Sequence, residues 1–200
     1  MSRAVSLVML ASGDSRRFDG NKLLCPFHGK PMYRHLADRA LSLRGIVFDR
    51  ICLVSQYGEI LRDMAAAGCL TVKNDRSDLG ISHSIRLGIA LTDEDSDLCF
   101  AVCDQPWLRA ETLAAFITGW RQSGKGLGCL GAEIPDGGLR LGNPAVFSRA
   151  YRGKLLALNG DVGGRAVIKK HPEDLFVFRV SDPRELFDVD TREALGCLHF

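Results

Sequence analysis

Short apolar runs alternate with amphipathic stretches through most of the chain, and this alternation is the feature that most constrains its fold. A short run reads as a buried strand, and an amphipathic stretch reads as a helix that covers the sheet. Strand followed by helix, repeated, predicts an α/β fold built on a doubly wound, mostly parallel sheet. The successive pairs are Val5–Leu10 with Met32–Leu43, Arg50–Val54 with Glu59–Ala67, Leu70–Val72 with Ser82–Leu91, and Asp97–Cys103 with Ala110–Arg121.

The rhythm changes after a further predicted strand at Leu127–Gly131. Gly137, Gly138 and Gly142 indicate a small hairpin insertion in place of another crossover. No linker, charge block or internal repeat divides the chain, so residues 1–200 are expected to form a single domain. The final third is predicted to hold two helices, 148–158 and 164–170, and two strands, Leu175–Val180 and Leu186–Val189.

Composition narrows the function classes. The 200 residues are 46% hydrophobic and 25% charged, which is typical of a globular domain. A net charge of +2 gives no overall attraction to nucleic acid or to a membrane surface, so neither partner is expected. Seven cysteines without a Cys-x-x-Cys pair, and no apolar run near the ~20 residues of a membrane span, predict a cytoplasmic protein with reduced thiols.

The loop that follows the first apolar run has the composition of a phosphate cradle. Small residues allow the backbone to approach an anion, and hydroxyl and cationic side chains donate to phosphate oxygens. The small residues after Leu10 are Ala11, Ser12 and Gly13, and the donors are Ser15, Arg16, Arg17 and Lys22.

This loop lacks the spacing of better-known motifs. Lys22 is followed by Leu23 where a Walker A loop needs Ser or Thr. No helix opens directly after Gly13, which argues against a dinucleotide fingerprint. Arg17 stands where a nucleophile elbow needs glycine, so a serine hydrolase is not expected either.

Two acidic positions could hold a metal ion. Asp104 follows a predicted strand that Pro106 ends, which places a carboxylate at the edge of the sheet, where it suits Mg²⁺ beside a bound nucleotide. The alternative role of Asp104 as the N-cap of the next helix does not fit the spacing, because that helix is predicted to begin at Ala110, too far along the chain. Asp188 and Asp190 alternate on a predicted strand and so share one face. From the residues alone, Asp190 is favoured as the cap of a last helix, with Glu193 completing a capping box.

Taken together, the motifs resemble the nucleotidyltransferases that load a nucleotide onto molybdopterin, and most closely the molybdenum cofactor cytidylyltransferase type. The resemblance runs from about Val5 to Leu195, with the motifs in the expected order. It implies a Rossmann-like fold of the nucleotide-diphospho-sugar transferase type. The motifs are Leu-Ala-Ser-Gly-x-Ser-x-Arg with Lys22-Leu-Leu, then Asp-Gln-Pro, Gly-Asn-Pro-Ala-Val-Phe, Gly-Asp-x-Gly-Gly-Arg and Asp-Val-Asp-Thr.

The resemblance also implies roles for individual residues. Lys22 and Arg17 would stabilise the transition state, Asp104 would be the principal Mg²⁺ ligand and Asp190 the second. The nucleotide would contact Leu10, Ala11, Ser12, Gly13, Ser15, Arg17, Lys22, Ser82 and Ser84. The pterin and its terminal phosphate would contact Gly142, Asn143, Pro144, Gly160, Asp161, Gly163, Gly164 and Arg165.

The expected reaction is transfer of CMP from CTP to the terminal phosphate of molybdopterin, with release of pyrophosphate and with transient contact to a molybdenum enzyme. Three alternatives remain open, and two departures from the family pattern, Asp19 in the phosphate loop and Asn143 where histidine is common, favour the last of them. The alternatives are a GTP-using guanylyltransferase, a sugar- or polyol-phosphate nucleotidyltransferase, and a non-catalytic carrier of the pterin cofactor. The choice of base and the acceptor are not fixed by the sequence.

Overall fold

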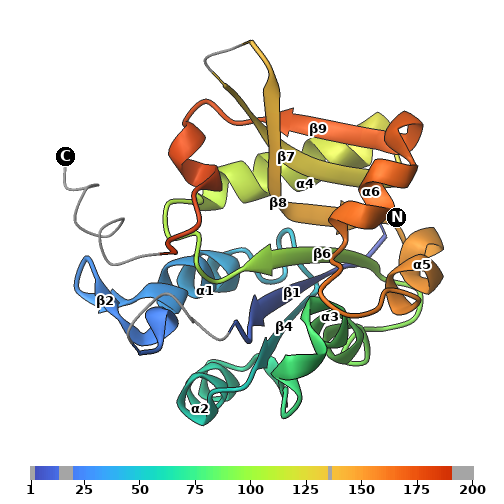
Figure 1. Cartoon of the computed structure of the whole chain (residues 1–200). Coiled ribbons are helices and arrows are strands. Elements are labelled where there is room, and N and C mark those ends of the chain that lie inside the picture. The colour runs from blue at the N-terminus through green and yellow to red at the C-terminus, as the bar shows by residue number, and fades with distance from the viewer. Residues whose placement is uncertain (1–2, 14–19, 135–136, 191–200) are drawn as a thin grey trace.

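The computed structural model describes residues 3–13, 20–134 and 137–190. Its main element is a seven-stranded sheet (Figure 1). Its strand order is β5-β4-β1-β6-β8-β7-β9. Strand β8 is antiparallel to β6 and β7, and the other neighbours are parallel, as the sequence predicts. The strands are β1 (Val5–Ala11), β4 (Arg50–Ser55), β5 (Leu70–Lys73), β6 (Asp97–Val102), β7 (Leu127–Glu133), β8 (Leu139–Phe147) and β9 (Leu175–Arg179).

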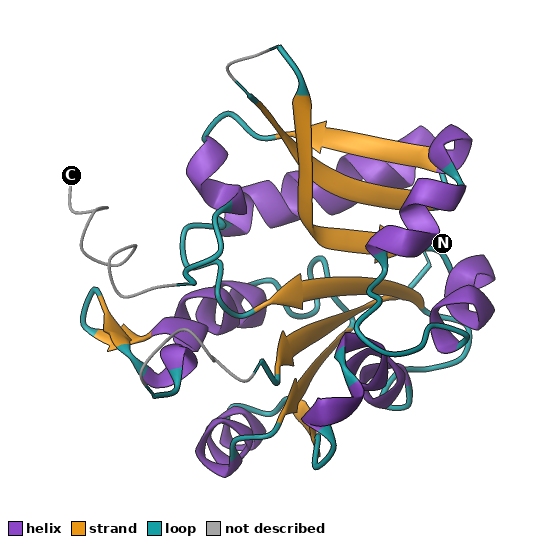
Figure 2. Cartoon of the chain, in the orientation of Figure 1, coloured by secondary structure: helices purple, strands orange, loops and turns teal. Residues whose placement is uncertain are grey.

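Helices cover both faces of this sheet (Figure 2). Leu36 of α1, Ile60 of α2 and Phe116 of α4 pack in the cluster on one face. Ile85 of α3 and Leu155 of α5 pack in the cluster on the other, together with α6. The helices are α1 (Met32–Ser42), α2 (Gly58–Ala66), α3 (Ile81–Ile89), α4 (Ala110–Ser123), α5 (Arg152–Leu156) and α6 (Arg165–Lys170).

Strand β1 lies at the centre of the parallel part of the sheet and fixes where a ligand can bind. Val5, Leu7 and Met9 point into one core cluster and Val8 into the other, so the strand is buried on both faces, and its one polar residue, Ser6, is hydrogen-bonded to the Ser96 hydroxyl. The chain adds β4 and β5 on one side of β1 and then returns to place β6 on the other side. In open α/β sheets, such a reversal leaves a crevice at the carboxyl ends of the strands, and ligands bind there.

The hairpin predicted around Gly137 and Gly138 is present, and its second strand belongs to the main sheet. β7 and β8 pair antiparallel, and β8 lies between β7 and β6. The sequence analysis did not identify β8 as a strand, because Gly142, Asn143 and Pro144 interrupt its apolar pattern. A second hairpin, formed by β2 (Pro26–Phe27) and β3 (Lys30–Pro31), was also missed because its strands have two residues each.

The predicted strand at Leu186–Val189 is wrong. Pro183–Leu186 form a 3-10 turn that Asp182 caps, and residues 187–190 follow without regular structure. Val189 makes a backbone hydrogen bond to the loop after β6 and none to an edge of the sheet. Asp188 and Asp190 therefore do not share a face of a strand. The alternation of apolar and acidic residues reflects the burial of Val189 beside the loop after β6.

The expectation of reduced thiols agrees with the described part of the chain. Its six cysteines, Cys25 to Cys129, are free thiols, and burial raises the pKa of Cys99 and Cys103. Cys197 lies outside the described residues. Among the helices that the structure describes, none combines the length and apolar character required to cross a bilayer.

Gly80 provides a test of how α3 is seated at the crevice. Its φ is +80°, and a β-carbon there would lie 2.5 Å from the carbonyl carbon of Gly160. Gly80→Ala is expected to lower the free energy of unfolding by about 2–4 kcal/mol, because strain and overlap add. Gly124→Ala is the matched control, since Gly124 also has a positive φ, +69°, but faces open space. Urea denaturation of both variants checks this, and equal losses would contradict it.

Candidate active site

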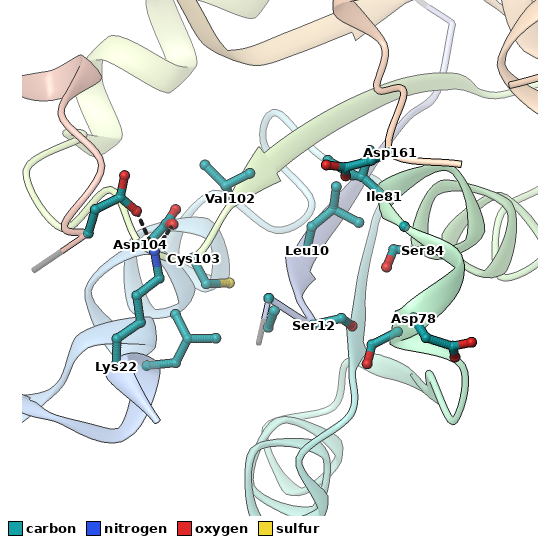
Figure 3. A pocket seen from close by; sticks show the side chains of 16 residues that line it. Leu10, Ser12, Lys22, Asp78, Ile81, Ser84, Val102, Cys103, Asp104 and Asp161 are labelled. Carbon is teal, nitrogen blue, oxygen red and sulfur yellow. Dashed lines mark hydrogen bonds and ion pairs between the residues drawn. The ribbon is translucent and has the colours of Figure 1, made fainter. Parts of the chain in front are cut away.

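A cleft of about 590 Å³ opens at the carboxyl edge of the sheet, where β1 and β6 end. Figure 3 shows Lys22 and Asp104 on one side of it and Asp78, Ser84 and Asp161 on the other. The residues come from segments that are far apart in the sequence, as expected for the crevice beside a central strand. The volume lies in the range that small-molecule ligands occupy.

Lys22 joins the two aspartates that the sequence analysis singled out. Its Nζ donates to Oδ2 of Asp104 at 2.6 Å and to Oδ1 of Asp190 at 3.0 Å. Asn21 caps the 3-10 turn Lys22–Leu24, with its side chain accepting from the amide of Leu23, and this turn directs Lys22 into the cleft. Burial alone would lower the pKa of Lys22, but the two carboxylates more than offset it and raise the pKa above 10.5.

Asp104 lies in the loop after β6, and its two carboxylate oxygens have different surroundings. Its Oδ1 is buried and has no hydrogen-bond partner among the described residues, while Oδ2 accepts from Lys22. The helix after this loop, α4, has Arg109 as its N-cap residue, so Asp104 is not a cap. Arg39 of α1 donates to the carbonyls of Pro106 and Leu108 and anchors the loop. A fixed, partly uncompensated carboxylate of this kind is suited to a hard cation.

Asp190 reaches the cleft from the far end of the chain. The amide of the preceding residue, Val189, donates to the carbonyl of Asp104 at 2.9 Å, and the Val189 side chain is fully buried. These contacts bring Asp190 beside Lys22. The alternative role of Asp190 as the cap of a last helix concerns residues 191–200, including Glu193, which lie outside the described residues.

The start of the predicted phosphate loop lines the cleft directly after β1. The carbonyls of Ala11, Ser12 and Gly13 accept hydrogen bonds from the side chains of Ser55, Gln56 and Tyr57, respectively. The Ser12 hydroxyl is buried without a hydrogen-bond partner among the described residues. The remaining loop positions of the prediction, Ser15 and Arg17, lie outside the described residues, as does Asp19.

The opposite wall is the N-terminal end of α3 and the turn before it. Ser84 lines the cleft and accepts a hydrogen bond from Asn74 at 2.9 Å. Ser82 does not line it: its side chain is buried, and its amide donates to the carbonyl of Gly160. Of the two serines of α3 predicted to contact the nucleotide, the structure therefore brings one, Ser84, into the cleft.

The residues predicted to bind the acceptor are dispersed, and Asp161 is the member of that set that lines the cleft. Gly142, Asn143 and Pro144 belong to β8, with Gly142 packed against Leu186. The other glycines serve close packing: Gly160 lies against Gly80, Gly163 against Ile81 and Gly164 against Phe147, while Arg165 begins α6 and is exposed.

Several lining residues were not identified from the sequence. Ser77, Asp78, Gly80 and Ile81 form the turn into α3 and border the cleft. A sequence signal for these residues does exist: Gly80 stands directly before the apolar helical stretch of α3, and the strand before it, β5, ends at the carboxyl edge of the sheet. Cys103 also borders the cleft, but burial raises its pKa, which is consistent with the predicted structural role of its thiol.

The sequence of the chain is similar to those of known proteins. The family model described as MobA-like NTP transferase domain matches residues 7–175. The chain is 30% identical over 165 residues to the bifunctional protein GlmU of Alkalilimnicola ehrlichii, covering 81% of this chain and 33% of that protein. It thus spans about one third of the length of this curated relative.

Solved structures share the fold at lower identity. Rv0371c from Mycobacterium tuberculosis superposes with a TM-score of 0.77 at 23% identity, covering 98% of this chain and 97% of that one. The structure of CMP:2-keto-3-deoxy-manno-octonic acid synthetase complexed with CTP gives a TM-score of 0.75 at 15% identity, covering 97% and 96%. These similarities confirm the predicted type of fold.

The position of Lys22 predicts a pH dependence of stability. Because its folded-state pKa is raised above 10.5, the ion pairs stabilise the fold fully below that pH and lose their effect as the pH rises through the raised pKa. Lys22→Met is expected to cost about 1–3 kcal/mol at pH 7, between the values for exposed and buried pairs. The difference from the wild type should shrink above pH 10.5.

Denaturant unfolding at pH 7 and at higher pH measures this effect. Lys73→Met is the control, because Lys73 pairs with Asp75 on the surface and its loss should cost less than about 1 kcal/mol. A Lys22→Met deficit that stays constant with pH would show that Lys22 does not act through its charge.

Proposed function

The chain belongs to the MobA-like NTP transferase domain family, and from this premise we propose that it is a nucleotidyltransferase that transfers CMP from CTP to the terminal phosphate of molybdopterin. The observation that carries the proposal is the convergence of Lys22, Asp104 and Asp190 beside the Ala11–Gly13 loop. An ammonium group and two carboxylates beside a loop of small residues suit a reaction that joins two phosphates. The preference for CTP and molybdopterin rests on the motif resemblance.

The donor set fits a magnesium ion held by Asp104 and Asp190. Both side chains offer carboxylate oxygens at one end of the cleft, and the buried Oδ1 of Asp104 has no hydrogen-bond partner among the described residues. Mg²⁺ prefers one or two carboxylates together with phosphate oxygens and water. A bound Mg²⁺ would supply Lewis-acid charge on the phosphates of the nucleotide.

The protein's own residues supply positioning and charge. The acceptor phosphate is already ionised near neutral pH, so its oxygen can attack the α-phosphorus of the nucleotide without a protein base, while the bond to pyrophosphate breaks. Two anions must approach each other in this step. Lys22 places a fixed positive charge against that repulsion, and the Ala11–Gly13 loop holds the backbone close to the phosphates. Arg17 is proposed to add a second positive charge.

The wall formed by α3 and its preceding turn is proposed to hold the nucleoside. Ser84 and Gly80 border the cleft there, and their small size leaves room for a planar base and a ribose. Asp161 borders the same cleft and is proposed to contact the acceptor. With a carboxylate it can accept hydrogen bonds from ring N–H and amino groups, which a pterin offers.

Substitution of Asp104 tests the proposed metal role. Asp104→Ala is expected to lower kcat by at least about 100-fold, because the charge that holds the cation is lost, while the protein still folds, at a cost no larger than the about 1–3 kcal/mol expected for Lys22→Met. Asp95→Ala is the control, since Asp95 is exposed in the loop before β6. Pyrophosphate release measures the rate, and undiminished turnover by Asp104→Ala would refute the assignment.

A nucleotide panel tests the choice of substrate. Purified protein with Mg²⁺ and molybdopterin is expected to release pyrophosphate with CTP and not with GTP, ATP or UTP. A preference for GTP would indicate a guanylyltransferase. Activity with a sugar phosphate or polyol phosphate in place of molybdopterin would show that the acceptor is of that class and not a pterin. Binding of pterin without turnover by any of the four nucleotides would favour a carrier of the cofactor.

A further inference from the structure

The two aspartates of the cleft are carried by two segments that run side by side. Residues 104–109 follow β6, and residues 185–190 begin within the 3-10 turn Pro183–Leu186 that comes after β9; we call this pair of segments the clasp. At the cleft end, Val189 donates its amide to the carbonyl of Asp104 at 2.9 Å. The next contact is from Nε2 of Gln105 to Oδ1 of Asp188 at 2.8 Å. The segments thus run antiparallel, away from the cleft.

The far end of the clasp is an ion pair between Arg109 and Glu185. Oε1 of Glu185 accepts from Nε of Arg109 at 3.0 Å and from a terminal guanidinium nitrogen at 2.6 Å. Oε2 accepts from the backbone amide of Arg109 at 3.0 Å. The Glu185 side chain is only 1% exposed, whereas that of Arg109 is 50% exposed. A carboxylate is stable at such burial only when it is paired and hydrogen-bonded, so this contact is firmly fixed.

Each segment is also anchored to the rest of the protein. Leu186 is buried against Gly142, and Val189 is buried with Met32 and Trp107. Arg39 holds the other segment through two of its carbonyls. The clasp therefore has rigid supports on both sides, and the Arg109–Glu185 pair joins the two segments five residues from each aspartate.

We propose that Glu185 and Arg109 are positioning residues that set the register of the clasp and thereby hold Asp104 and Asp190 in place to share one divalent cation. The inference rests on the proposed metal role of these aspartates. Glu185 and Arg109 do not line the cleft, so they act through the segments that they join. Partners that orient the ligands of a metal ion commonly contribute 10–100-fold to its affinity.

Binding of Mn²⁺ alone, measured by isothermal titration calorimetry, tests the proposal without relying on turnover. Glu185→Gln is expected to weaken Mn²⁺ binding by about 10–100-fold relative to the wild type. Arg184→Gln is the matched control: it removes an exposed ion pair with Asp182 on the same 3-10 turn and should leave Mn²⁺ affinity unchanged. Equal Mn²⁺ affinity of Glu185→Gln and the wild type would overturn the positioning role and leave the metal site standing.

Hydrogen exchange of the Val189 amide gives a readout that needs no metal. Loosening of the clasp by Glu185→Gln is expected to speed this exchange about tenfold or more, with core amides of β1 unaffected. Unchanged exchange at Val189 would overturn the proposal. If the wild type itself binds no Mn²⁺, the metal role of Asp104 and Asp190 fails, and the positioning role fails with it.

Arg109→Lys keeps the positive charge but provides a single donor group in place of the guanidinium fork, and it decides the matter if Glu185→Gln does not fold. For Arg109→Lys, we expect a Mn²⁺ affinity and a Val189 exchange rate between those of the wild type and those expected for Glu185→Gln. Wild-type values for both quantities would overturn the proposal.

Discussion

The positive charge of Lys22 between Asp104 and Asp190 is the interaction on which the cleft depends. The two carboxylates approach the same point from segments 82 and 168 residues away from Lys22, and without a cation they would repel each other. Lys22 follows β1, Asp104 follows β6, and Asp190 follows β9. One ammonium group therefore ties three distant parts of the chain together at the edge of the sheet. A divalent cation on the same carboxylates would compete with Lys22 and free it for phosphate.

The two walls of the cleft divide the chemistry. One wall carries the cation Lys22 beside Asp104, and the opposite wall, at α3, carries Ser84 together with the carboxylates of Asp78 and Asp161 (Figure 3). Strand β1 ends between them and delivers the Ala11–Gly13 loop to the centre. This division suits the proposed placement of a nucleotide, with its phosphates toward Lys22 and its base toward α3.

The sequence predicted what depends on local pattern, and it missed what depends on contacts between distant segments. Apolar runs such as Val5–Leu10 predicted the parallel strands well, because a strand buried on both faces consists mainly of apolar residues. The alternation at residues 186–189 predicted a strand, but Val189 is buried against Met32 and Trp107 and pairs with a loop. Asp161 and Ser84 line the cleft as predicted, whereas Ser82 is buried and does not line it. Nothing in the local sequence marks Glu185 as buried.

The most direct test of the account is a crystal structure of the protein with CTP and Mn²⁺, with the anomalous signal used to locate the metal. The account predicts a manganese peak bound by carboxylate oxygens of both Asp104 and Asp190, with Lys22 turned from them toward phosphate oxygens. A structure with CTP in the cleft, no metal at these carboxylates and Lys22 still bridging them would contradict the central claim.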